Sequence, residues 1–197
     1  MKNIKRILVD LDPTKDQQPA LSRAIYLAKC YQASITLFVV AYNRGIVSNL
    51  FFNPLQLEQA KEGYLKTQQR WLDSYLAEAA KQGISVDAKV VWGKPIYQEI
   101  NQQAELGNYD LIIKSTHHHP LVNKLLFTPN DWQLLKTTKI PIIMAKQVQQ
   151  NQYDNVLAAI DSNTQHEYSA ELNRKILSNV MGISSRCQSA PSRGPLL

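Results

Sequence analysis

The chain has 197 residues, of which 44% are hydrophobic and 19% are charged, a balance typical of a globular protein rather than a disordered one. No apolar run approaches the ~18 residues that a membrane helix needs, so a membrane-spanning class is excluded. The net charge of +6 is scattered, with no basic cluster larger than Lys5–Arg6, and nucleic-acid binding is therefore not expected.

The cysteine content and the first residues predict a cytoplasmic protein. Cys30 and Cys187 are the only cysteines, and neither has metal-ligand spacing or a CxxC partner. Free thiols are the rule in a reducing cytoplasm. The early apolar run Ile7–Leu11 is too short for a signal peptide, and Asp10 interrupts it.

The chain begins with a strand, a helix and a second strand. Lys5–Leu11 is apolar and β-branched, as expected of a buried strand. Pro19 suits the first turn of a helix, and apolar residues follow at helical spacing up to Tyr31. Ser34–Ala41 has the composition of a second buried strand.

A loop, a long helix and a third strand come next. Asn43–Asn53 is predicted to be a loop that carries two exposed aromatic residues. The apolar stripe of a helix runs from about Pro54 to Gln82, and Gly83 fits a helix stop. Ile84–Trp92 alternates apolar and polar residues, which is typical of a half-buried strand.

The remaining elements of the first domain follow a turn at Gly93–Pro95. A helix with Ile96, Ile100 and Ala104 on one face is predicted to end at Gly107–Asn108. Tyr109–Ile113 is predicted to be the fourth strand. Pro129–Thr137 has the pattern of a short helix, and Ile140–Lys146 that of a fifth strand.

Alternating strands and helices predict an α/β fold. We expect a doubly wound, open, parallel five-stranded sheet in residues 1–147, with helices on both faces and right-handed crossovers. This arrangement collects the strand-to-helix loops at the carboxyl edge of the sheet, where ligands bind in such folds.

The pattern restarts after a polar linker at 148–153. The strand-like Asn155–Asp161 mirrors Arg6–Asp12, and Tyr168–Leu177 has the stripe of the first helix. Residues 154–181 are therefore interpreted as the first strand and helix of a second, truncated copy. Residues 182–197 are rich in Ser, Arg and Pro and are predicted to be an irregular tail.

Several segments, in their order and spacing, resemble the universal stress protein family, and the tandem layout resembles its two-domain members. The segments are RILVDLDP, DQQPALSRAIYLA, VVWGKP, DLIIK and IPIIMAK. The resemblance implies the doubly wound fold above and a role in survival under starvation or DNA damage. It implies no mechanism.

The resemblance also places a candidate nucleotide site after the fourth strand. Nucleotide-binding members carry G-x-x-G, nine residues, then G-[S/T], and the equivalent positions here are Ser115, His118, Thr128 and Pro129. No glycine is present at any of them. Each replacement adds a Cβ where bare backbone would meet phosphate, and Pro129 removes a donor N–H. A degenerate loop is therefore predicted.

Three further residues complete this candidate degenerate site. Asp12 matches the family aspartate near ribose and adenine, and Val39 matches the adenine-contact position. Asp12 has an alternative role, which is to cap the backbone N–H groups of the following loop. Lys114 could attract a phosphate as a point charge or extend from the sheet edge into water.

No catalytic or metal site is predicted. The run His117–His119 is expected to be a surface loop, because adjacent histidines point to alternate sides and no acidic or thiol ligand is near in sequence. Asp10 and Asp12 on one strand could form an acid–base pair. No nucleophile motif accompanies them, so we expect a protein that is not an enzyme.

The leading hypothesis is a non-enzymatic stress-response protein that has no cofactor and acts through protein contacts. The alternative is an adenine-nucleotide (ATP) binder that uses an altered loop, and a weak nucleotide hydrolase is a third reading. Ile140–Lys146 is an apolar edge strand, which predicts a homodimer or tandem-domain pairing through that strand.

Overall fold

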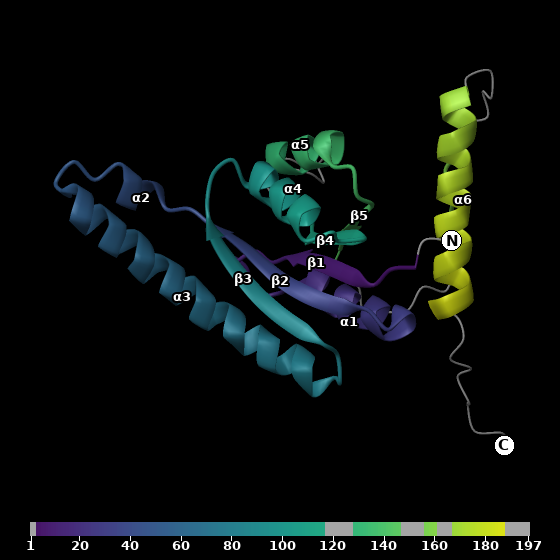
Figure 1. Cartoon of the computed structure of the whole chain (residues 1–197), viewed down its shortest axis with the longest axis horizontal. Helices are drawn as coiled ribbons and strands as arrows, with labels where there is room; N and C mark the ends of the chain where they lie inside the picture. The colour runs from purple at the N-terminus through teal and green to yellow at the C-terminus, as the bar shows by residue number, and fades with distance from the viewer. Residues whose placement is uncertain (1–2, 117–127, 147–155, 161–166, 188–197) are drawn as a thin grey trace. The chain divides into compact units, whose positions relative to one another are not determined.

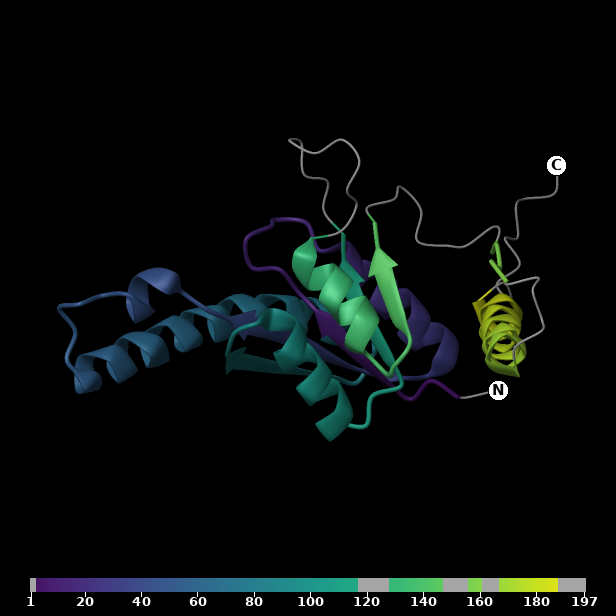
Figure 2. The ribbon, with the colours of Figure 1, turned by 90° about the horizontal axis from the view of Figure 1, so that it is seen from above.

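A computed structural model of the chain describes residues 3–116, 128–146, 156–160 and 167–187. The chain divides into two compact units, a larger one of residues 4–148 and a smaller one of residues 1–3 and 149–197. Figures 1 and 2 show both units from two directions.

The larger unit alternates strands and helices along the chain. Its strands are β1 (Arg6–Asp10), β2 (Ser34–Ala41), β3 (Val86–Trp92), β4 (Leu111–Ser115) and β5 (Ile142–Ala145). Its helices are α1 (Pro19–Tyr31), α2 (Arg44–Val47), α3 (Pro54–Lys81), α4 (Ile96–Leu106) and α5 (Pro129–Thr137).

The strands form one sheet in the order β3-β2-β1-β4-β5, and each neighbouring pair is parallel. Helices α1 and α3 lie on one face, and α4 and α5 lie on the other (Figure 1). The predicted doubly wound, five-stranded parallel sheet is therefore confirmed. The strand order reverses direction between β1 and β4, and ligands of such folds bind at the carboxyl ends of the strands at this switch point.

The core explains why the central strands are continuous apolar runs. Both faces of β1 and β2 are covered, so successive side chains are buried whichever way they point. On the α4/α5 face, Leu8, Phe38 and Ile112 from three neighbouring strands pack with Ile100 of α4 and Leu134 of α5. Side chains at even positions of β1 and β4 therefore face α5.

Helix α2 lies within a segment that was predicted to be a loop, 43–53. Asn43 starts this helix, since its side-chain oxygen accepts a hydrogen bond from the Ile46 N–H at 3.3 Å. A single short turn carries too little periodicity to be found from sequence. The long helix α3 begins with a capping box between Asn53 and Gln56 and extends past the sheet together with α2 (Figures 1 and 2).

The smaller unit differs from its prediction in two places. Residues 156–160 form no strand, because a strand needs a neighbour to satisfy its backbone groups. Helix α6 (Glu167–Cys187) includes the predicted helix but continues through residues 182–187, which were predicted to belong to an irregular tail. The apolar stripe continues there at Ile183, seven positions after Ile176, and no proline interrupts it before residue 188.

In the part of the chain that the structure describes, no helix combines the length and apolar character needed to cross a membrane.

Candidate functional site

The candidate site lies at the carboxyl ends of β1 and β4, where the strand order reverses. The register pairs Asp10 directly with Lys114, so their side chains leave the sheet on the same face. That face is covered by α5, whose first turn supplies a third charged group, Asp131.

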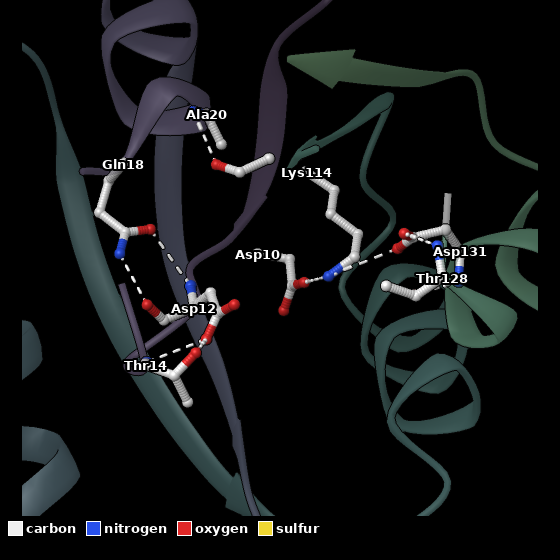
Figure 3. Close-up of polar contacts among 9 residues, drawn as sticks. Asp10, Asp12, Thr14, Gln18, Ala20, Lys114, Thr128 and Asp131 are labelled. Carbon is white, nitrogen blue, oxygen red and sulfur yellow. Dashed lines mark hydrogen bonds and ion pairs between the residues drawn. The ribbon is translucent and has the colours of Figure 1, made fainter. Parts of the chain in front are cut away.

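These three residues form a buried ion cluster (Figure 3). The Lys114 ammonium makes a short ion pair with Asp10 Oδ2. Its distance to Asp131 Oδ1 is 3.9 Å. Both carboxylates are almost fully buried, and Asp131 Oδ1 accepts no hydrogen bond from the described residues.

Burial and charge act on the cluster in opposite directions. Removal from water raises the pKa of Asp10 above its ordinary value, although the Lys114 charge works against this rise. For Lys114, burial alone would lower the pKa. The carboxylates of Asp10, Asp131 and Asp12 outweigh it, and the pKa of Lys114 is raised. The lysine is therefore held in its charged form.

Asp131 also closes the N-terminus of α5. Its Oδ2 accepts a hydrogen bond from the Thr128 N–H at 2.7 Å, and the Thr128 hydroxyl accepts one from the Asp131 N–H at 3.2 Å. The exposed N–H groups and the dipole of a helix start attract anions. Here that place is taken by a carboxylate of the protein itself.

Ser115 points to the opposite face of the sheet. Its Oγ accepts a hydrogen bond from the backbone N–H of Ala20 at 3.1 Å, in the first turn of α1. The N-cap residue of α1, Gln18, makes no side-chain cap bond, so the hydroxyl from β4 satisfies a helix-start donor. Lys114 and Ser115 therefore do not converge on one ligand.

Asp12 acts as a cap in the loop after β1. Its Oδ1 accepts hydrogen bonds from the Thr14 N–H at 2.9 Å and the Thr14 hydroxyl at 2.7 Å. The buried Gln18 side chain ties the same loop together, because its amide donates to the carbonyls of Asp12 and Lys15 and accepts from the Asp12 N–H. The printed hydrogen bonds of Asp12 go to Thr14, whereas Asp10 pairs with Lys114 (Figure 3).

Of the other predicted site residues, Thr128 lies beside the ion cluster through its bonds to Asp131, whereas Val39 is in the interior of the sheet. Val39 is completely buried within β2, and Thr128 is used as the cap of α5. His118 and the run His117–His119 lie outside the described residues. Among the described residues no group of three or more acidic, histidine or cysteine side chains could hold a metal ion.

Sequence reasoning did not find the ion cluster or the roles of Gln18 and Ser115. One signal was present: Asp10 and Lys114 each interrupt an otherwise apolar strand near its end. In a doubly wound sheet the first and fourth strands are neighbours, so opposite charges at these positions can pair. Asp131 is three positions after Thr128, the spacing of a capping box.

Comparison with known proteins identifies relatives of this chain. The model of the universal stress protein family matches residues 3–146. Universal stress protein E of Photorhabdus laumondii is 30% identical over 191 residues, which are 97% of this chain and 61% of that protein. The chain thus spans about three fifths of the length of this relative.

Solved structures share the fold. A putative universal stress protein from Pseudomonas aeruginosa UCBPP-PA14 superimposes with a TM-score of 0.74 at 24% identity, over 94% of this chain and 59% of that one. A universal stress protein crystallised in complex with cAMP has a TM-score of 0.54 at 13% identity, over 74% of this chain and 98% of that one. The chain belongs to the universal stress protein family, and most of its length is homologous to universal stress protein E.

Proposed function

We propose that the chain is a non-enzymatic stress-response protein that acts through protein contacts in general stress or DNA-damage survival, and that its nucleotide-binding edge is degenerate. One observation carries the second part of this proposal. The helix start that would face a phosphate is occupied by the Asp131 carboxylate, which Lys114 neutralises from within the protein.

Electrostatics support the same conclusion. The negative charges of three carboxylates, those of Asp10, Asp12 and Asp131, act on the Lys114 ammonium and raise its pKa. A triphosphate carries several negative charges, so an edge with excess negative charge repels it. A lysine that would attract phosphate must first give up a buried partner, and breaking a buried pair is costly.

Three backbone donors among the described residues of the edge are also in use. A phosphate would need free N–H groups at a helix start or in a glycine loop. The Ala20 N–H donates to Ser115, and the N–H groups of Thr128 and Asp131 are satisfied by the capping box of α5. The hydroxyls of Ser115 and Thr128 accept two of these bonds, so both are already used in capping helix starts.

The rival function is adenine-nucleotide binding by an altered mode. It is favoured by the fold shared with the universal stress protein crystallised with cAMP. In that reading, Asp12 would leave Thr14 to meet a ribose, and the segment after Ser115 would supply phosphate contacts.

A calorimetric titration of the full chain with ATP, and separately with cAMP, tests the two functions. We expect no saturable heat with either nucleotide, while the universal stress protein crystallised with cAMP serves as the positive control for cAMP. Saturable micromolar binding that Asp12→Ala abolishes would establish the rival function. Phosphate release from ATP that depends on Asp12 would further contradict the non-enzymatic proposal.

We also propose that the protein is cytoplasmic and that β5 pairs with a second copy or with a tandem domain. Cys30 is a free thiol, which suits a reducing compartment. Strand β5 pairs only with β4 in this sheet, so its other side presents unpaired backbone groups.

A further inference from the structure

A second exposed feature lies away from the ion cluster, where α2 leads into α3. We call residues 47–55 the α2–α3 tip. It presents five large apolar side chains to solvent: Val47, Leu50, Phe51, Phe52 and Leu55. Leu50 is 96% exposed and Phe51 is 94% exposed. Both views place the tip at the end of the larger unit that is remote from β5 (Figures 1 and 2).

Hydrogen bonds fix the conformation of the α2–α3 tip. The Asn49 side chain accepts a bond from the Phe51 N–H at 3.0 Å, and the Asn49 carbonyl accepts one from the Phe52 N–H at 3.3 Å. The reciprocal bonds of Asn53 and Gln56 then start α3. This hydrogen-bonded turn keeps the side chains of Leu50 and Phe51 exposed to solvent. An exposed apolar patch of this kind is typical of an interaction surface.

The charge of the tip selects its partner. No residue from Gly45 to Leu57 is charged. A nucleic acid or an anionic lipid surface would be met by basic side chains, and the tip has none. The basic side chain nearest in sequence is the exposed Arg44, which begins α2, and on α3 Glu58 and Lys61 neutralise each other in an ion pair at 2.7 Å.

A neutral apolar surface is complementary to itself. In a two-fold dimer the same patch faces itself, so like charges would repel whereas apolar side chains pack. We propose that the α2–α3 tip is a self-association surface that is covered by the tip of a second copy of this chain. This interface is separate from the β5 edge and goes beyond the proposed function.

The exposed area is compatible with such a dimer. A fully exposed phenylalanine offers about 200 Å² of surface, so the five side chains together offer on the order of 500 Å². Two tips facing each other would bury about 1,000 Å² in total, which is the lower limit for a specific interface. We therefore expect a reversible dimer rather than an obligate one.

Sedimentation equilibrium of the full chain, over a wide concentration range, tests the proposal. The tip variant combines Leu50→Asp with Phe51→Asp, and the matched control is Leu106→Asp at an exposed leucine at the end of α4. We expect self-association to weaken at least tenfold in the tip variant and less than twofold in the control. Circular dichroism checks that each variant is folded.

The same comparison is repeated with Met144→Pro in every chain, so that pairing through β5 is removed and the two interfaces are measured separately. A tip variant that self-associates as strongly as the control in both settings overturns the proposal, whatever the result for β5. A chain that is monomeric at every concentration also overturns it.

Photo-crosslinking identifies the occupant of the tip. A benzoylphenylalanine at position 51 is introduced into a mixture of isotopically labelled and unlabelled copies. Crosslinks between copies that join residues 47–55 to each other support the proposal. Crosslinks within one copy, to another region of a second copy, to lipid or to a different protein contradict it.

Discussion

Lys114 places a positive charge near the carboxyl end of β4, one residue before the strand ends. It lies beside Asp10 at the switch point of the strand order, where ligands of doubly wound folds bind. The Lys114 side chain is largely buried, and its ammonium group pairs with the carboxylates of Asp10 and Asp131. We therefore expect this cluster to contribute to the stability of the fold rather than to bind an anion.

Replacing this lysine is expected to destabilise the protein. Lys114→Met keeps the side-chain length but leaves the buried Asp10 without its cation, which should lower the free energy of unfolding by about 3–5 kcal/mol. Because the folded pKa of Lys114 is raised above 10.5, its contribution is fully present below that pH and is lost as pH rises through the folded value. Urea unfolding of both proteins from pH 7 to pH 11 should show their difference shrinking at the alkaline end.

A double variant serves as the control for this prediction. Asp10→Asn combined with Lys114→Met removes both charges of the pair, so it should recover a large part of the lost stability. A Lys114→Met protein as stable as the wild type would mean that the ammonium contributes nothing to folding. A double variant less stable than Lys114→Met would mean that the aspartate does not need its cation.

Individual residue roles could be predicted only where the partner is near in sequence. The capping alternative for Asp12 rested on local turn chemistry, and its bonds to Thr14 agree with it. The partners of Lys114 and Ser115 come from β1, α5 and α1, and the choice among them depends on strand order and side-chain parity. Those are properties of the assembled sheet.

Elements with strong local signals were predicted closely. Helix α5 has the predicted bounds, because proline at its first position and a capping residue before it define its start. Strand β3 starts at Val86, two residues later than predicted, since its partner β2 decides where pairing begins. Residues 156–160 have the apolar pattern of a strand but do not form one, because a strand needs a neighbouring strand as its hydrogen-bond partner.

The start of α5 can be tested through Asp131. Asp131→Ala removes the reciprocal cap and one carboxylate near Lys114, and we expect a loss of about 1–3 kcal/mol in the free energy of unfolding. Asp131→Asn can still accept the Thr128 N–H and should lose less. Asp87→Ala, at an exposed position of β3, is the surface control. Equal losses for the Ala and Asn variants would assign the effect to charge rather than to capping.

At the scale of the whole molecule, we have proposed two association surfaces among the described residues of the larger unit. The sheet ends at β5, and the α2–α3 tip projects at the other end of the larger unit. A chain with two separate two-fold interfaces can extend into open assemblies, whereas a chain with one stops at a dimer. Variants at each surface distinguish the two cases.

Proline in β5 should block pairing through its free edge. The carbonyl of Pro141 accepts a bond from Ile112 of β4, and that of Ala145 accepts one from Thr116, the residue after β4. By alternation the backbone groups of Met144 therefore point away from β4. Met144→Pro removes an outward N–H and spares the bonds to β4. We expect the mass measured by sedimentation to fall toward the monomer, with less than about 1.5 kcal/mol lost in stability. Association that is unchanged in a folded Met144→Pro chain would exclude β5 as the interface.

The bond from the Ala20 amide to the Ser115 hydroxyl ties the beginning of the first helix to a strand made 95 residues later. During synthesis, the Ala20 amide therefore lacks this hydrogen-bond acceptor until most of the domain has left the ribosome. Deuterium uptake at the Ala20 amide would accordingly report the docking of the fourth strand, rather than the winding of the helix to which the amide belongs.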